Sequence, residues 1–282
     1  SGVVKGPLGG ITNGTSDASS TSDQVINITG GEITNTSNST TSIYVRKGQS
    51  TISGGTIEGG TGVYVYTGTL KVTDGKIIGN KYKGINVTSS GTLELGTSDT
   101  ATPKLVPEIT GKENGVSVAS TATFNYYDGT IIGDVSDGAI SGEISKKPSS
   151  YYPLSEFTDT QEKITLGIAE AYIGSTNSKY FGLLEDAIEA SKTGETIYFA
   201  KNITKTSTIT IGETKNIIIN TNVYNLTSSA SYALKNQGTL KIIGSGIISG
   251  LSGVSNVGTL DISSITIKAN SSTGISNTGE LT

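Results

Sequence analysis

The composition of the chain argues against a conventional layered core. Its 282 residues include 38 glycines and only 33% hydrophobic residues, a balance that favours a thin, elongated core in one large domain or two modest ones. Charged residues make up 16% of the chain with a net charge of -4, and no apolar run reaches the roughly twenty residues that span a bilayer. We therefore expect no nucleic-acid partner and no membrane insertion. Without Cys, the sequence offers no disulfides and no thiolate metal ligands.

The first half of the chain contains short β-rich segments that recur. Residues 1–23, rich in Gly, Ser, Thr and Asp, are predicted to be a linker or the end of a preceding coil. From residue 24 to 147 one segment recurs at spacings of 20, 22 and 31 residues, as Ile43–Val45, Val63–Val65, Ile85–Val87 and Val116–Val118. A period of this length is typical of solenoids, in which neighbouring repeats stabilise one another. Residues 24–147 are therefore the first predicted array.

Each of these repeats contains three short β-rich runs separated by Gly-centred turns, as in residues 63–66, 69–72 and 76–78. Apolar and polar residues alternate along the runs, as in strands with one buried face. Because successive coils rise by about 4.8 Å, equivalent residues stack, and we expect an interior column of Val45, Val65, Val87 and Val118. Parallel crossovers are nearly always right-handed. The sequence thus predicts an all-β fold, a right-handed parallel β-helix with three faces and about 20–23 residues per coil.

The middle of the chain interrupts the repeat. Two prolines within Lys146–Pro153 are unsuited to a central strand, so we expect the first array to end there. Residues 148–176 are predicted to form a connector. Within it, Lys163–Leu166 and Glu170–Ile173 are predicted to pair as a small hairpin.

One amphipathic helix is predicted at residues 183–191, before a second array. Its apolar residues Leu184, Ala187 and Ile188 share one face. We expect this face to cap the second array, because the first coil of a stack exposes a core cross-section and unpaired backbone groups. The second array is predicted to span 177–282 and, since its last repeat stops part-way, the sequence reads as a fragment of a longer chain.

A short motif recurs three times in the second array at spacings of 20 and 21 residues, beginning at Asn236, Asn256 and Asn277. In each case the Asn is followed two residues later by Gly and four residues later by Leu. An Asn amide can both donate a hydrogen bond to an identical amide and accept one from it. We therefore predict a structural ladder of stacked Asn side chains.

The stretch from Lys179 to Thr204, followed by an Asn-x-Gly-Thr-Leu coil, resembles the opening of pectate-lyase-like, right-handed parallel β-helix modules in large tandem-repeat surface proteins of bacteria. The resemblance covers nearly the whole chain and is one of architecture. It implies a secreted or cell-surface location and a role as an adhesin or stalk, commonly without catalysis. Shared architecture does not by itself carry function.

Catalytic and metal-binding chemistry has few candidate residues in this sequence. The chain contains no His, and Arg46 is its only Arg, so the usual general acid-base residue is missing. The best acidic cluster is Asp128, Asp134 and Asp137, a weak candidate for catalysis or for Ca²⁺. Because these acids adjoin glycines in predicted turns, turn chemistry alone explains them. We expect no enzyme activity, no cofactor and no metal.

The best candidate binding residues are aromatic. Tyr44 and Tyr64 occupy equivalent outward positions one coil apart, with Arg46 and Tyr66 two residues further along. Aromatic faces on a rigid β surface can stack on sugar rings. The alternative is that these side chains only pack against one another across strands and stabilise the sheet.

Three functions are compatible with this sequence. The leading hypothesis is a non-enzymatic bacterial surface protein, an adhesin or stalk that binds a glycan or a host or cell-surface ligand. The second is a structural subunit whose coil ends associate end to end into an extracellular fibre. The third is a polysaccharide-active lyase or hydrolase, for which a pair of carboxylates about 5 to 10 Å apart would be needed.

Overall fold

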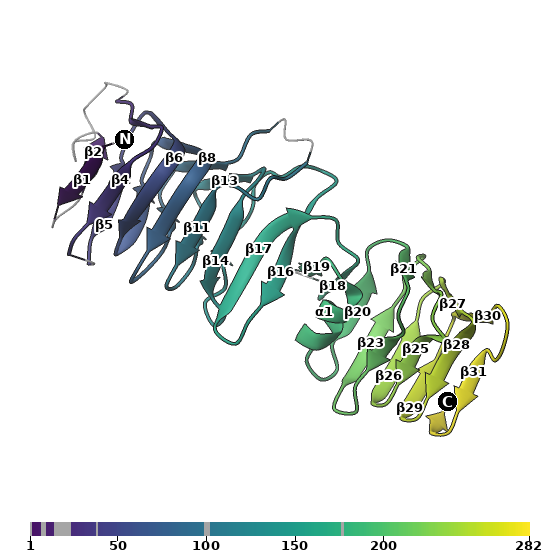
Figure 1. The fold of residues 1–282 in the computed structure, drawn as a ribbon. Coiled ribbons are helices and arrows are strands. Elements are labelled where there is room, and N and C mark those ends of the chain that lie inside the picture. Colours follow the sequence, from purple (N-terminus) through teal and green to yellow (C-terminus); the bar gives the residue numbers. More distant parts are fainter. Residues whose placement is uncertain (1, 7–9, 14–23, 38, 99–101, 176–177) are drawn as a thin grey trace. The chain divides into compact units, whose positions relative to one another are not determined.

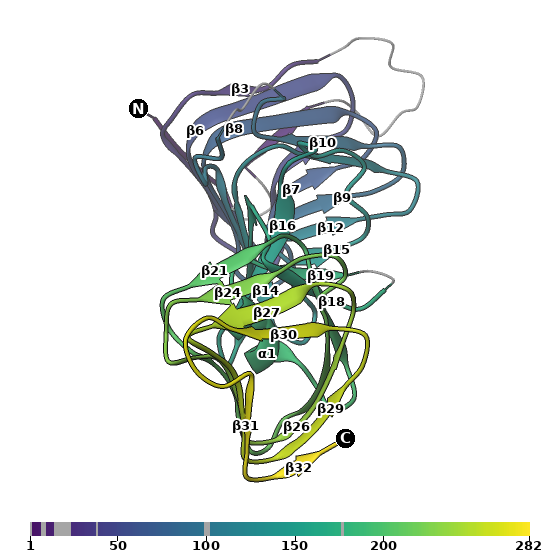
Figure 2. The same cartoon turned by 90° about the vertical axis from the view of Figure 1, so that its right-hand side faces the viewer.

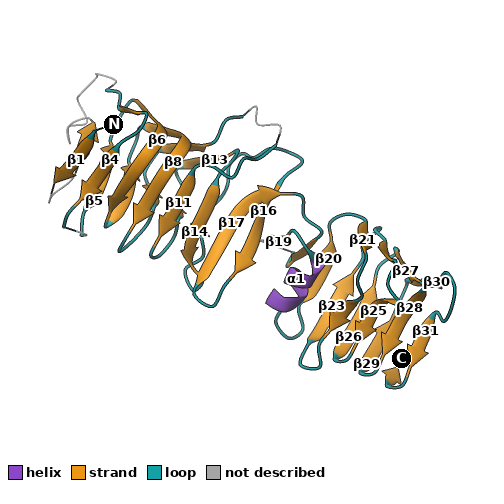
Figure 3. Ribbon diagram, viewed as in Figure 1, coloured by secondary structure: helices purple, strands orange, loops and turns teal. Residues whose placement is uncertain are grey.

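The computed structural model describes residues 2–6, 10–13, 24–37, 39–98, 102–175 and 178–282. It is nearly all β, with 53% strand and 3% helix, and forms a parallel β-solenoid (Figures 1 and 3). The chain divides into two compact units, unit 1 (Ser1–Gly167) and unit 2 (Ile168–Thr282).

Two parallel sheets build the coils of unit 1. The first sheet contains β1 (Val3–Gly6), β3 (Asn27–Ile28), β4 (Glu32–Asn35), β6 (Gln49–Gly59), β8 (Thr69–Gly79), β10 (Thr92–Leu95), β11 (Glu108–Gly111), β13 (Thr123–Tyr126) and β14 (Thr130–Asp134). The second sheet contains β2 (Ile11–Asn13), β5 (Thr41–Val45), β7 (Thr61–Val65), β9 (Ile85–Val87), β12 (Val116–Val118) and β15 (Ile140–Ser141). The long strand β6 pairs with both β3 and β4, and β8 with both β10 and β11. The first sheet therefore supplies two faces of the coil and the second sheet supplies the third.

Stacked glycines form the corner within the first sheet. Gly31, Gly55 and Gly75 all have a positive φ, between 90° and 101°. A Cβ atom on Gly75 would lie 2.8 Å from the carbonyl oxygen of Gly55 in the neighbouring coil. Only Gly combines this backbone conformation with such a close approach. The turns that the sequence places at these glycines thus become sharp corners that keep successive coils in register.

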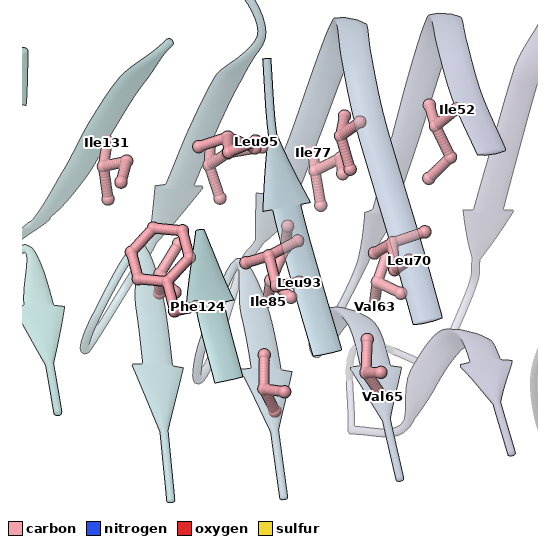
Figure 4. Close-up of a cluster of buried hydrophobic side chains, with 14 of the residues drawn as sticks. Ile52, Val63, Val65, Leu70, Ile77, Ile85, Leu93, Leu95, Phe124 and Ile131 are labelled. Atoms are coloured by element: carbon pink, nitrogen blue, oxygen red, sulfur yellow. The ribbon is translucent and has the colours of Figure 1, made fainter. Parts of the chain in front are cut away.

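The core of unit 1 consists of columns of identical or similar side chains. The predicted column is confirmed, because Val45, Val65, Val87 and Val118 are all buried and pair in register from coil to coil. Another column on the first sheet consists of Ile57, Ile77, Ile109 and Ile131. Figure 4 shows buried aliphatic side chains on neighbouring strands of this interior, with the ring of Phe124 among them. The predicted three-faced parallel solenoid is confirmed in this unit.

The two ends of unit 1 differ from the sequence-based boundaries. At the N-terminal end, β1 pairs in parallel with β4 and β2 with β5, so these residues belong to a preceding coil, the second of the two predicted alternatives, and are not a linker. The other residues of this segment, 1, 7–9 and 14–23, lie outside the described residues. At the other end, the last parallel contact joins Asn125 to Lys146. An antiparallel hairpin then completes the unit, which ends at Gly167 rather than at residue 147.

The hairpin predicted inside the connector does not form. Its first segment lies in β17 (Gln161–Gly167), which pairs antiparallel with β14 and with β16 (Tyr152–Phe157). Its second segment lies in β18 (Ala171–Ile173), which pairs antiparallel with β19 (Lys179–Phe181) and β20 (Thr196–Phe199). β14 is the last parallel strand of the first sheet in unit 1, so the backbone groups along its outer edge need hydrogen-bond partners. β17 supplies these partners by pairing antiparallel with β14.

Unit 2 has three parallel sheets, one for each face of the coil. The first contains β20 with β23 (Asn216–Asn220), β26 (Thr239–Ile243), β29 (Thr259–Ile262) and β32 (Glu280–Leu281). The second contains β21 (Ile203–Lys205), β24 (Leu226–Ser228), β27 (Ile247–Gly250) and β30 (Thr266–Ala269). The third contains β22 (Ile209–Ile211), β25 (Tyr232–Asn236), β28 (Ser252–Asn256) and β31 (Ile275–Asn277). Figure 2 shows β21, β24, β27 and β30 as successive rungs.

The helix α1 (Leu184–Ala190) lies at the beginning of unit 2 and is two residues shorter than predicted. Leu184, Ala187 and Ile188 are buried and belong to the same core cluster as the strands of the first coil. The helix contacts β18, β19, β20 and β22. Its apolar face therefore covers the first coil of this stack, in the position that the sequence suggests for a cap.

Candidate functional site

The aromatic residues singled out in the sequence lie together on the outer face of the second sheet of unit 1. Tyr44 on β5 and Tyr64 on β7 are in register, with ring centroids 5.6 Å apart and ring planes inclined by 43°. The guanidinium carbon of Arg46 lies 5.5 Å from the centroid of the Tyr44 ring. Together with Tyr66, whose side chain is 46% exposed, these residues line a depression of about 380 Å³.

Polar residues continue this outward column on the neighbouring coils. Thr12 precedes Tyr44, and Asn86, Ser117 and Ser141 follow Tyr64 in register. The aromatic surface is therefore confined to two coils. On both sides of this aromatic surface, the outward column continues with side chains that can form hydrogen bonds.

The ring of Tyr64 is held from the next coil. The hydroxyl of Thr88 donates a hydrogen bond of 3.0 Å to the phenol oxygen of Tyr64. Because this oxygen is the acceptor, the phenol keeps its own proton to donate. The cation–π contact between Arg46 and Tyr44 similarly restrains the guanidinium. The depression is thus preorganised by contacts within the sheet, which lowers the entropy cost of binding.

The structure gives Asp128 a structural role. Its carboxylate is buried, and it accepts backbone N–H hydrogen bonds from Lys104, Leu105 and Gly129 at 2.7–3.0 Å. These bonds anchor Lys104 and Leu105, which lie shortly before β11. Several backbone donors satisfy a buried carboxylate without a metal or a counterion.

Asp134 and Asp137 do not join Asp128 in a common site. The carboxylate of Asp134 accepts hydrogen bonds from the hydroxyl and the backbone N–H of Ser136, and these bonds lower the pKa of Asp134. The carbonyl oxygen of Asp137 accepts a hydrogen bond from the amide of Asn114. Within the described residues, no group of three or more His, Cys, Asp or Glu side chains is placed to hold a metal ion.

The Asn side chains of unit 2 form a hydrogen-bonded row. The amide nitrogen of Asn236 donates to Asn256 at 2.8 Å, and that of Asn256 donates to Asn277 at 2.7 Å. Each of these two amides also donates to the carbonyl of the Gly two residues later and to a carbonyl of the next coil. The row begins at Asn236 because Ile211 occupies the equivalent position in the preceding coil, which leaves the side-chain oxygen of Asn236 without a partner.

An ion triad beside the helix is not predicted by the sequence. The ammonium of Lys205 lies 2.8 Å from the carboxylate of Glu170 and 2.6 Å from that of Glu185. Glu170 also accepts the backbone N–H of Leu184 at the start of α1. Burial by itself would lower the pKa of Lys205, but hydrogen bonds to both carboxylates and their charges raise it. No spacing in the sequence signals this triad, since its members come from a strand end, a helix and a loop.

A second row of tyrosines lies on the outer face of unit 2. Tyr180, Tyr172 and Tyr198 are in register on β19, β18 and β20. The ring centroids of Tyr172 and Tyr198 are 5.0 Å apart, with an interplanar angle of 12°. Because these ring faces cover one another, the two rings mainly stabilise the sheet. Alternation with the buried residues Ala171, Ile197 and Phe199 is the sequence signal that could have identified the row.

No helix among the described residues is long and apolar enough to cross a membrane. In comparisons with known proteins, no family model, no curated protein and no solved structure matches this chain.

Proposed function

We propose that this chain is part of a non-enzymatic bacterial surface protein, an adhesin or stalk in which a rigid β-solenoid presents a saccharide-binding face. The observation that carries the proposal is the depression lined by Tyr44, Arg46, Tyr64 and Tyr66 on the outer face of the second sheet. It combines aromatic surface with hydrogen-bond donors, and sugars offer the matching C–H faces and hydroxyl groups.

The regular stacking of coils supports a role in presentation. Successive coils of unit 1 pair through parallel strands in both sheets, and the Val and Ile columns fill the interior. A site built on such strands is held more precisely than one built on flexible loops. Repeated coils also place a binding face at a distance from the point of attachment.

The chemistry of the acidic residues supports a role without catalysis. A glycosidase needs two carboxylates that face a common cleft. Asp128 is occupied by backbone donors, and Glu170 and Glu185 are bridged by Lys205. The six strands of the second sheet of unit 1 contain no Asp or Glu at all. The chain also has no His for general acid-base chemistry.

A glycan array probed with the labelled chain tests this proposal. The wild-type protein and a Tyr82→Ala control should bind the same set of saccharides, because Tyr82 does not line the depression. Tyr64→Ala should lower binding by tenfold or more, equivalent to about 1.4 kcal/mol. Circular dichroism would verify that both variants fold.

Bound saccharides should also be recovered intact after prolonged incubation. Undiminished binding by Tyr64→Ala, or release of shortened or unsaturated sugar products, would contradict the proposal.

A further inference from the structure

We propose that the depression binds a saccharide bearing a single carboxylate, which Arg46 recognises. This inference rests on the proposed saccharide-binding function and specifies its ligand. Arg46 is the only cationic residue among the four that line the depression, and it is the only Arg in the chain. A guanidinium has five N–H donors in a planar fork that matches the two oxygens of a carboxylate.

The electrostatic environment of this face differs from that of the neighbouring face. On the first sheet of unit 1, lysines lie beside carboxylates, as in Lys76 and Glu108 at 2.7 Å and Lys5 and Glu32 at 3.6 Å. The strands of the second sheet carry no carboxylate. The outward positions next to the tyrosines are Thr12, Asn86, Ser117 and Ser141, which are neutral. A carboxylate in the depression therefore meets a cation and no repelling acid on these strands.

The number of charges limits the ligand to one anionic group at this site. The chain as a whole has a net charge of -4, which repels a densely charged polyanion. One guanidinium in the depression pairs with one carboxylate. The tyrosine rings, inclined by 43° to one another, provide apolar surface for the uncharged part of the sugar. The geometry fits an acidic sugar within an otherwise neutral saccharide.

Methyl glucuronide and its methyl ester are matched probes, because they differ mainly in the carboxylate charge. Binding of each would be measured by NMR titration of the full chain at millimolar sugar concentrations. The wild-type protein should bind the acid at least fivefold more tightly than the ester. Raising the salt concentration from 50 to 500 mM should weaken binding of the acid and leave that of the ester unchanged, since salt screens exposed charges.

Two variants separate recognition by Arg46 from a change in overall charge. Arg46→Gln should bind the acid and the ester equally. Lys71→Gln removes one positive charge from the first sheet of the same unit and should keep the wild-type preference. If both variants lost the preference for the acid over the ester to the same extent, the inference would be overturned. Equal binding of the acid and the ester by the wild-type protein would also overturn it.

The outcomes also separate this inference from the proposed function. If the ester binds as well as the acid and Tyr64→Ala abolishes both, the saccharide-binding function stands and the carboxylate preference is refuted. If neither sugar binds and the glycan array is also blank, both proposals fall. Tighter binding of dextran sulfate than of the single-carboxylate sugar would refute the limit to one anionic group.

Discussion

The row of Asn side chains gives the most direct test of how unit 2 is stabilised. Asn256 is 1% exposed, and its amide nitrogen donates to Gly258, Asn277 and Glu280 at 3.1, 2.7 and 2.8 Å. Its side-chain oxygen accepts the amide of Asn236. Asn256→Ala removes all of these contacts, in which two N–H groups are shared among three oxygen acceptors.

A hydrogen bond contributes about 0.5–1.5 kcal/mol net, and buried groups that lose their partners cost more than exposed ones. Some of the abandoned carbonyl groups, such as that of Glu280, lie near the surface and can bind water. We therefore expect Asn256→Ala to lower the free energy of unfolding by about 2–4 kcal/mol. For a unit of this size, that corresponds to a fall in Tm of roughly 8 °C or more.

The matched control is Asn270→Ala, because the side chain of Asn270 is exposed and lies outside the row. A surface substitution of this kind changes stability by less than about 0.5 kcal/mol. Urea unfolding and differential scanning calorimetry of both variants would measure the difference. Equal shifts in the two variants would show that the stacked amides do not contribute to stability.

Three further predictions test the fold, the cap and the ion triad. Far-ultraviolet circular dichroism should show a β-dominated spectrum, and a helix content above about one third, the average of globular proteins, would refute the solenoid. Leu184→Asp places a charge against the core of unit 2. Limited proteolysis with mass analysis should then detect cleavage within residues 168–282 while residues 24–167 stay intact. Equal cleavage of both units would refute the idea that the two units are stable independently of one another. The pKa of Lys205 is raised by folding, so its contribution to stability is present below the unfolded pKa of about 10.4 and is lost as the pH rises through the higher folded value. The difference in unfolding free energy between the wild type and Lys205→Met should therefore be constant from about pH 7 to 10 and shrink above about pH 10.4; a difference that grows in that range would contradict this assignment.

The sequence by itself determined the solenoid and much of its interior. A parallel stack brings residues one period apart into contact, so spacing along the chain is enough to pair Val45 with Val65 or Asn236 with Asn256. Alternation within each strand then decides which side chains enter the core. The same rule predicts that Tyr44 lies beside Tyr64 on the outer face, as the structure shows.

The tertiary structure decided everything that the repeat does not cover. Residues 163–166 and 170–173 both have strand patterns, but their partners depend on which strand edges remain unpaired at the last coil of unit 1 and the first coil of unit 2. Asp128 looked like a turn residue, and only the folded loop brings three backbone N–H groups to its carboxylate. Lys205, Glu170 and Glu185 meet where a strand, a loop and a helix converge. A period predicts contacts between equivalent residues, whereas contacts at the ends of a stack join residues that have no equivalents.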